Sequence, residues 1–200
     1  TVILVDLGCK ENIVRSLVRR GVNVLRVPWD YDWTREQADG VMLSNGPGDP
    51  EPVTYAIENA RAFLGERIPI FGICLGHQLL GLALGGRTYK MPFGHRGVNQ
   101  PVKNVQTGAV EITSHNHGFA VDPLGWEREA DGTALSDRGR VALTHWNLND
   151  GTLEGLRCLV VVGGVGFHEA LLDAVAGDVV PDLDERLVGD SLDETETEQG

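Results

Sequence analysis

The sequence predicts an α/β fold: an open, mostly parallel sheet with helices on both faces and added antiparallel hairpins. Through the first half of the chain, short apolar runs alternate with segments of helical periodicity, which is typical of βαβ units. From about residue 111, short strand-like pieces separated by turns indicate antiparallel hairpins. The length of 200 residues suits one domain, which we place at residues 1–176, with an acidic, flexible tail at 177–200.

The individual elements follow from the positions of the apolar residues. Buried strands are predicted at residues 2–6, 22–27, 40–44 and 68–73. Helices are predicted at residues 13–18, 53–64 and 77–84, and glycines follow the first and the last of them. Further strands are expected at residues 110–114, 119–122, 141–146, 153–157 and 158–164, and a helix at 168–177. Function in parallel sheets collects at the carboxyl ends of strands, which directs attention to the loops after residues 44 and 73.

The composition excludes several classes of partner. The formal charge is −12, and residues 177–200 alone hold nine acids and one arginine. An acidic surface argues against nucleic acid and anionic membranes. No apolar run approaches the ~18 residues that span a bilayer, and no signal-peptide pattern is present. The cysteines number three and show no metal-ligand spacing, which favours a reduced, cytoplasmic protein over a disulfide scaffold.

Cys74 lies in the stretch FGICLGHQL, between a predicted strand and a predicted helix. This order is typical of a nucleophile elbow, a strained turn that exposes a reactive side chain. At the start of a helix, backbone N–H groups and the helix dipole stabilise a thiolate and an oxyanion. The alternative is a buried core cysteine, the commoner fate of a lone thiol.

Two further loops offer binding groups. Gly46 and Gly48 lie in LSNGPGDP, where bare backbone amides can line a pocket, although Gly-Pro and Asp-Pro also mark ordinary turns. Asn116 and Phe119 lie in SHNHGFAVD, where they supply an amide and an apolar wall, although a polar hairpin turn fits too.

A metal site is not predicted. His115, His117 and His145 are the histidines that we considered for one. No carboxylate or thiol is spaced along the sequence to complete such a ligand set.

Taken together, these motifs resemble a known family. FGICLGHQLLGLALGG resembles the nucleophile motif of class I glutamine amidotransferases. LSNGPGDP, KMPFGHRGVNQPV, ITSHNHGFAVD and NLNDGTLEGLR resemble the glutaminase domain of carbamoyl-phosphate synthase small subunits. The resemblance covers residues 2–157, with the motifs in the family's order. It also implies that the family's preceding domain is missing from this chain.

The resemblance implies a mechanism and a partner. Cys74 would attack the side-chain amide of glutamine, form a γ-glutamyl thioester and release ammonia. The ammonia would pass to a large synthetase subunit, in a heterodimer or higher assembly. That subunit would bind ATP and metal, and no cofactor is expected in this chain. The glutamine contacts implied by the motifs are Gly46, Gly48, Leu75, Gln78, Asn116, Gly118 and Phe119, with the Leu75 N–H as oxyanion donor. His77 is expected to be structural.

The catalytic base is where the sequence departs from the family. The family carries a His-Pro-Glu triplet, whereas here Glu169 directly follows His168. We expect His168 to be the base and Glu169 to orient it, although adjacent residues on a strand face opposite sides. The other histidines considered for the base are His115, His117 and His145.

Three other functions stay open at this point. The altered triplet allows a catalytically impaired module that binds glutamine or a partner. The chain could also be an amidotransferase of another pathway, or a generic α/β cysteine hydrolase.

Overall fold

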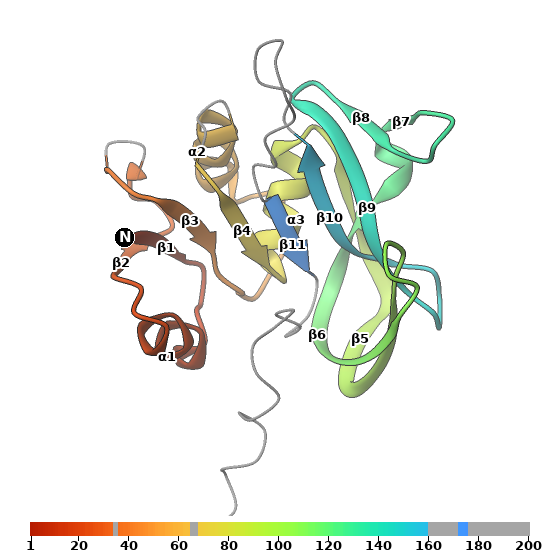
Figure 1. The fold of residues 1–200 in the computed structure, drawn as a ribbon, viewed down its shortest axis with the longest axis horizontal. Helices are drawn as coiled ribbons and strands as arrows, with labels where there is room; N and C mark the ends of the chain where they lie inside the picture. The colour runs from red at the N-terminus through yellow and green to blue at the C-terminus, as the bar shows by residue number, and fades with distance from the viewer. Residues whose placement is uncertain (34–35, 65–67, 160–171, 176–200) are drawn as a thin grey trace, which may run out of the picture.

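A computed structural model describes residues 1–33, 36–64, 68–159 and 172–175 of the chain. It contains an 11-stranded sheet in the order β2-β1-β3-β4-β11-β10-β6-β5-β9-β8-β7. Figure 1 shows the N-terminal strands in red to yellow on one side of the molecule and the later strands in green to blue on the other. The predicted α/β class is confirmed.

The first part of the sheet is parallel. Its strands are β1 (Val2–Asp6), β2 (Val24–Pro28), β3 (Gly40–Leu43), β4 (Ile70–Ile73) and β11 (Leu172–Val175). The helices are α1 (Glu11–Arg19), α2 (Thr54–Leu64) and α3 (Leu75–Ala83). Strands and helices up to residue 84 therefore lie where the apolar pattern predicted them, with ends that differ by at most two residues.

The second part of the sheet is antiparallel and larger than the predicted hairpins. Its strands are β5 (Arg87–Asn104), β6 (Val110–Asp122), β7 (Glu127–Arg128), β8 (Ala134–Ser136), β9 (Gly139–Asn147) and β10 (Leu153–Leu159). A short 3₁₀ turn, η2 (Pro123–Gly125), follows β6. The pairing of β10 with β11 joins this part to the parallel strands.

A later strand was missed, and two expectations about the later elements are wrong. The 18-residue strand β5 was not predicted, because its polar residues break the apolar alternation. Residues 110–114 and 119–122 form one strand, since the polar residues between them pair across to β5. Leu172–Val175, inside the predicted helix 168–177, is a strand that pairs with β4 and β10, and this tertiary pairing overrides local helix propensity. The predicted tail, residues 177–200, lies outside the described residues.

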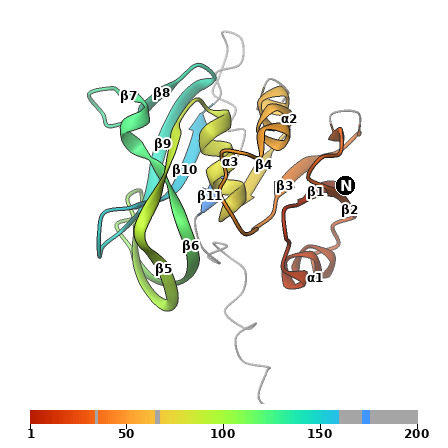
Figure 2. The same cartoon turned by 180° about the vertical axis from the view of Figure 1, so that it is seen from behind.

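Helix α3 connects the two parts of the sheet. It contacts β4 in the parallel part and β5, β6 and β10 in the antiparallel part. It lies on the face of the sheet that Figure 2 turns toward the viewer. Leu79 and Leu80 are fully buried, and a Cβ added at Gly81 would lie 2.8 Å from the Val121 side chain. None of the helices in the described part of the chain has the length and apolar character to cross a membrane.

Leu80→Ala should lower the free energy of unfolding by about 2–5 kcal/mol, because it opens a cavity where α3 meets the core. Leu124→Ala is the matched control, since Leu124 is 84% exposed and should change stability by less than about 0.5 kcal/mol. Urea denaturation measures both. Equal effects of the two changes would contradict the packing of α3 described above.

Candidate active site

Cys74 sits at a sharp turn between β4 and α3. It is the N-cap of α3, with φ 53° and ψ −105°. Among the described residues, it is the only one other than glycine with a positive φ. Such a backbone conformation costs free energy for a residue that has a Cβ atom. It is a known feature of strand-to-helix turns that carry a nucleophile. The predicted elbow is therefore present in the backbone.

Two glycines make room for this turn. A Cβ at Gly76 would lie 2.2 Å from the Leu43 carbonyl oxygen, and one at Gly72 would lie 2.5 Å from the Gly76 carbonyl oxygen. The Gly76 N–H donates to the Ser44 carbonyl oxygen at 3.2 Å. Only glycine allows the start of α3 to approach the end of β3 this closely. The turn at Cys74 therefore needs the two glycines of the FGICLG sequence.

The start of α3 favours negative charge beside Cys74. The first N–H groups of a helix have no acceptor within the helix, and the helix dipole is positive at this end. The N–H of Leu75 is the first of these groups after Cys74, and the Leu75 side chain is buried. A thiolate on Cys74 and an oxyanion next to it would both be stabilised there.

Cys74 opens onto a cavity of about 430 Å³, within the ~300–1,000 Å³ range typical of small-molecule sites. The structure brings together six of the seven predicted glutamine contacts around it: Gly46, Gly48, Gln78, Asn116, Gly118 and Phe119. The seventh, Leu75, adjoins Cys74 at the start of α3. Residues from a loop, a helix and β6 thus meet at one place, at the carboxyl ends of β3 and β4.

Gln78 ties α3 to β6. Its side chain is 2% exposed, and its Nε2 donates to the Phe119 carbonyl oxygen at 2.7 Å. The same carbonyl accepts from His117 Nδ1 at 2.9 Å. Part of the hydrogen-bonding capacity of Gln78 therefore positions a wall of the cavity, in addition to any contact with a ligand.

Strand β5 supplies a wall of the cavity that the sequence did not predict. Lys90, Phe93 and Arg96 line it, together with Met91, Pro92 and Gly94. Lys90 and Arg96 are exposed and bring positive charge to a cavity otherwise lined by neutral groups and His117. The motif KMPFGHRGVNQPV was noted in the sequence, but no strand was predicted there. Its position beside Cys74 could therefore not be inferred.

The histidines considered as alternative bases lie in different surroundings. His117 lines the cavity, but its Nδ1 is hydrogen-bonded to Phe119 and its Nε2 lies 3.1 Å from His115 Nδ1. His115 is buried behind it, and His145 Nδ1 lies 2.9 Å from Thr144 Oγ1 on β9. Neither of these two lines the cavity. His77 is fully buried within α3.

The expected base, His168, and its orienting residue, Glu169, lie outside the described residues. Their roles stay a prediction. The described histidines do not replace them, because the one that lines the cavity directs both ring nitrogens to other partners.

Comparisons with known proteins agree with this geometry. A chain named carbamoyl phosphate synthase small chain from Syntrophotalea carbinolica is 54% identical over 171 residues, covering 84% of this chain and 42% of the relative. The protein of the same name from Thermotoga maritima is 49% identical, covering 78% of this chain and 46% of the relative. This chain therefore spans less than half the length of these relatives.

A solved structure with a similar fold and a family sequence pattern also match this chain. The crystal structure of a glutamine amidotransferase from Thermotoga maritima aligns with a TM-score of 0.57 at 17% identity, over 88% of this chain and 74% of the other. That level of identity supports the fold alone. The sequence pattern of the family described as glutamine amidotransferase class-I matches residues 3–170. The chain therefore belongs to the class-I glutamine amidotransferase family.

Proposed function

We propose that this chain is the glutamine-hydrolysing part of a carbamoyl phosphate synthase small chain. The observation that carries the proposal is Cys74, held in a strained turn at a helix N-terminus and open to a cavity lined by the family's glutamine-contact motifs. The names of the relatives at about 50% identity support the choice of pathway. The likeness to solved amidotransferases favours no other pathway, because it rests on the fold.

The first half of the reaction forms a covalent intermediate. The thiolate sulfur of Cys74 attacks the side-chain amide carbon of glutamine, and the Leu75 N–H at the start of α3 stabilises the oxyanion. The carbon–nitrogen bond then breaks, and His168 gives the leaving nitrogen the proton that it took from the Cys74 thiol. Ammonia and a γ-glutamyl thioester on Cys74 are the products.

The second half of the reaction restores the thiol. His168 takes a proton from water, and the water oxygen attacks the thioester carbon. The carbon–sulfur bond breaks, the sulfur departs as thiolate, and glutamate leaves. Glu169 orients His168 in both halves. The half-reactions use no cofactor, since acid–base and nucleophilic groups of the chain carry every proton and electron pair.

The cavity suits an amino-acid substrate. Gly46 and Gly48 expose backbone along one wall, and Asn116 offers an amide donor and acceptor on β6. Lys90 and Arg96 place positive charge where a substrate α-carboxylate would be stabilised. A polar ligand of glutamine's size fits a cavity of about 430 Å³.

The released ammonia defines the partner. We infer a large synthetase subunit that binds ATP and its metal and consumes ammonia without letting it reach solvent, in a heterodimer or higher assembly. A reducing, cytoplasmic setting keeps Cys74 as the thiol that the reaction needs. A module that binds glutamine without turnover is the competing function, and glutamate release by the unaltered chain separates the two.

Cys74→Ala should lower glutamine-dependent synthesis of carbamoyl phosphate by about 10³-fold or more, because no other group can form the thioester. Synthesis from added ammonia should continue in the complex. Cys9→Ala is the control, since Cys9 lies outside the cavity, and it should keep full activity. Glutamine use that persists in Cys74→Ala would rule out Cys74 as the nucleophile.

Iodoacetamide at pH 7 should label Cys74 first. Burial raises the pKa of the Cys158 thiol to about 11, and burial also raises the pKa of the Cys9 thiol. Both are therefore protonated at neutral pH, so Cys158 should react at least about 100-fold more slowly than Cys74. Peptide mass spectrometry over time measures the three rates. Comparable labelling of Cys158 and Cys74 would contradict an activated Cys74.

His168→Asn should lower kcat for glutamate release by about 10²–10⁴-fold, the usual contribution of a general acid–base group. The matched control is His145→Asn, because His145 does not line the cavity and should leave kcat unchanged. The assay measures glutamate release by the chain with and without a synthetase partner. An unchanged kcat in His168→Asn would move the base to another residue, and no release by the unaltered chain would favour the binding module.

A further inference from the structure

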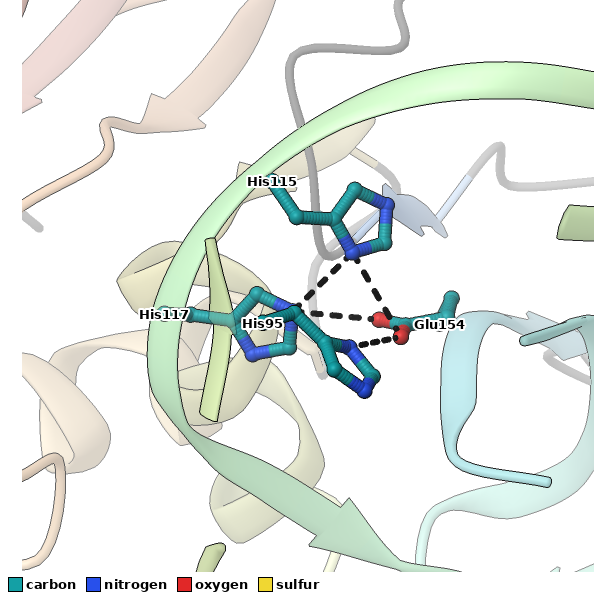
Figure 3. A group of neighbouring side chains, drawn as sticks. All are labelled: His95, His115, His117 and Glu154. Carbon is teal, nitrogen blue, oxygen red and sulfur yellow. Dashed lines mark hydrogen bonds and ion pairs between the residues drawn. The ribbon is translucent and has the colours of Figure 1, made fainter. Parts of the chain in front are cut away.

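Four buried side chains converge behind the β6 wall of the cavity. They are His95 on β5, His115 and His117 on β6, and Glu154 on β10, and each is less than 9% exposed. Figure 3 shows the three rings and the carboxylate pointing toward one another. One nitrogen from each ring and one carboxylate oxygen all lie within 4.8 Å of one another.

The fold places these residues together from distant parts of the sequence. His115 and His117 are two residues apart on β6, so their side chains leave the same face of the strand. His95 is the cross-strand neighbour of His117 in the pairing of β5 with β6. Glu154 comes from β10, and Figure 3 shows its carboxylate facing the rings from the other side.

The outer nitrogen of His115 is a hydrogen-bond donor. Thr113 Oγ1 donates its proton to the Gln100 carbonyl oxygen at 2.9 Å, and the same oxygen lies 2.8 Å from His115 Nε2. Because the hydroxyl proton is already used, the hydroxyl oxygen accepts from His115 Nε2. In the neutral ring, His115 Nδ1 then carries a lone pair that points into the cluster.

The other two rings are arranged in the same way. His117 Nδ1 donates to the Phe119 carbonyl oxygen at 2.9 Å, and His95 Nε2 donates to Asp150 Oδ2 at 2.8 Å. In the neutral ring, His117 Nε2 directs a lone pair inward. His95 Nδ1 lies 2.8 Å from Glu154 Oε1, so it offers a lone pair to the centre only when it gives up the proton shared with that carboxylate. A carboxylate, a backbone carbonyl and a hydroxyl hold the three rings from outside, as outer-shell groups do for histidines that bind metals.

The centre of the cluster therefore gathers acceptors that need a cation. The inner nitrogens of His115 and His117 lie only 3.1 Å apart, and Glu154 contributes a fully buried carboxyl group, whose Oε1 accepts from Asn147 Nδ2 at 3.3 Å. No described group donates a hydrogen bond to Glu154 Oε2, whose ion-pair contact is His117 Nε2 at 3.5 Å. Buried charge and converging lone pairs are costly unless a positive charge compensates them.

We propose that His95, His115, His117 and Glu154 form a structural site for a divalent transition metal ion, with Zn²⁺ as the best fit. Imidazole-rich sets suit Zn²⁺, and four protein ligands with no open position are typical of structural sites. Ligands about 2.0–2.1 Å from a tetrahedral Zn²⁺ lie about 3.3 Å apart. Four contacts among the inner atoms measure 2.8, 3.1, 3.5 and 3.5 Å, and all four ligand atoms lie within 4.8 Å of one another, so side-chain shifts of about 1–1.5 Å would give tetrahedral spacing.

This site differs from the one considered along the sequence. His145 is not part of it, and the missing carboxylate and third imidazole come from β10 and β5. The ion would brace the β6 wall of the cavity through His117 and would take no part in the proposed glutamine reaction. The proposal therefore does not rest on the proposed function.

The test is a titration of the metal-free, 200-residue chain with Zn²⁺ by calorimetry at pH 7. One equivalent should bind with a Kd below about 1 μM, as structural Zn²⁺ sites do. X-ray absorption should report nitrogen and oxygen ligands without sulfur. Bound Zn²⁺ should also raise Tm, because it binds the folded state. Absence of saturable binding would overturn the proposal. It would mean that protons on the imidazole rings, without a metal ion, compensate the charge of Glu154.

Variants connect the binding to these residues. Glu154→Gln and His115→Gln should each weaken Zn²⁺ binding by more than about 100-fold, since outer-shell changes alone cost about 10–100-fold. His145→Gln and Cys74→Ala are the matched controls and should bind like the unaltered chain. Circular dichroism verifies folding of each variant, and His115→Gln decides the outcome if Glu154→Gln does not fold. Full affinity in a folded ligand variant, or equal loss in either control, would overturn the proposal.

Discussion

The strained turn at Cys74 is the constraint on which the rest of the structure depends. A residue with a Cβ holds a positive φ there because Gly72 and Gly76 let the end of β4, the start of α3 and the end of β3 come into contact. The cost of this conformation is of order 1–3 kcal/mol. The packing of α3 against both parts of the sheet offsets it, since Leu79 and Leu80 are fully buried.

The carbonyl oxygen of Phe119 links the turn to the antiparallel half of the sheet. It accepts hydrogen bonds from Gln78 on α3 and from His117 on β6. His117 in turn faces the buried Glu154. The helix that begins next to Cys74, the wall of the cavity and the histidine cluster are therefore connected by a short series of polar contacts. Buried polar networks fix one arrangement of the groups that they join once each member has its partner.

Local sequence patterns predicted the parallel strands β1 to β4 well, because each is a short, mostly apolar run, and the helices between them are amphipathic or apolar. They also identified Cys74 and the loops that meet it. Strand β5 was not predicted because it is mostly polar and exposed. The positions of Lys90 and Arg96 on the cavity wall could therefore not be predicted either. The strand at Leu172–Val175 escaped because pairing on both sides, which no local pattern records, determines it.

The histidine cluster shows the same limit. Along the sequence, His115 and His117 have no partner at metal-ligand spacing, whereas the fold brings in Glu154 and His95 from other strands. The register of the strands determines which residues meet in such a cluster, and that register depends on the whole sheet. A nucleophile elbow is different, because it is formed by one continuous segment of the chain. Its strand, turn and helix follow one another in the sequence. For this reason the sequence alone located Cys74 and could not assemble the cluster.

The central claim is that Cys74 forms a covalent γ-glutamyl thioester during glutamine hydrolysis. Rapid mixing of the chain with glutamine, an acid quench at successive times and mass spectrometry of the Cys74 peptide test it most directly. The account predicts a γ-glutamyl adduct on Cys74 that appears before glutamate reaches its steady rate of release. Glutamate release with an unmodified Cys74 at every quench time would contradict it.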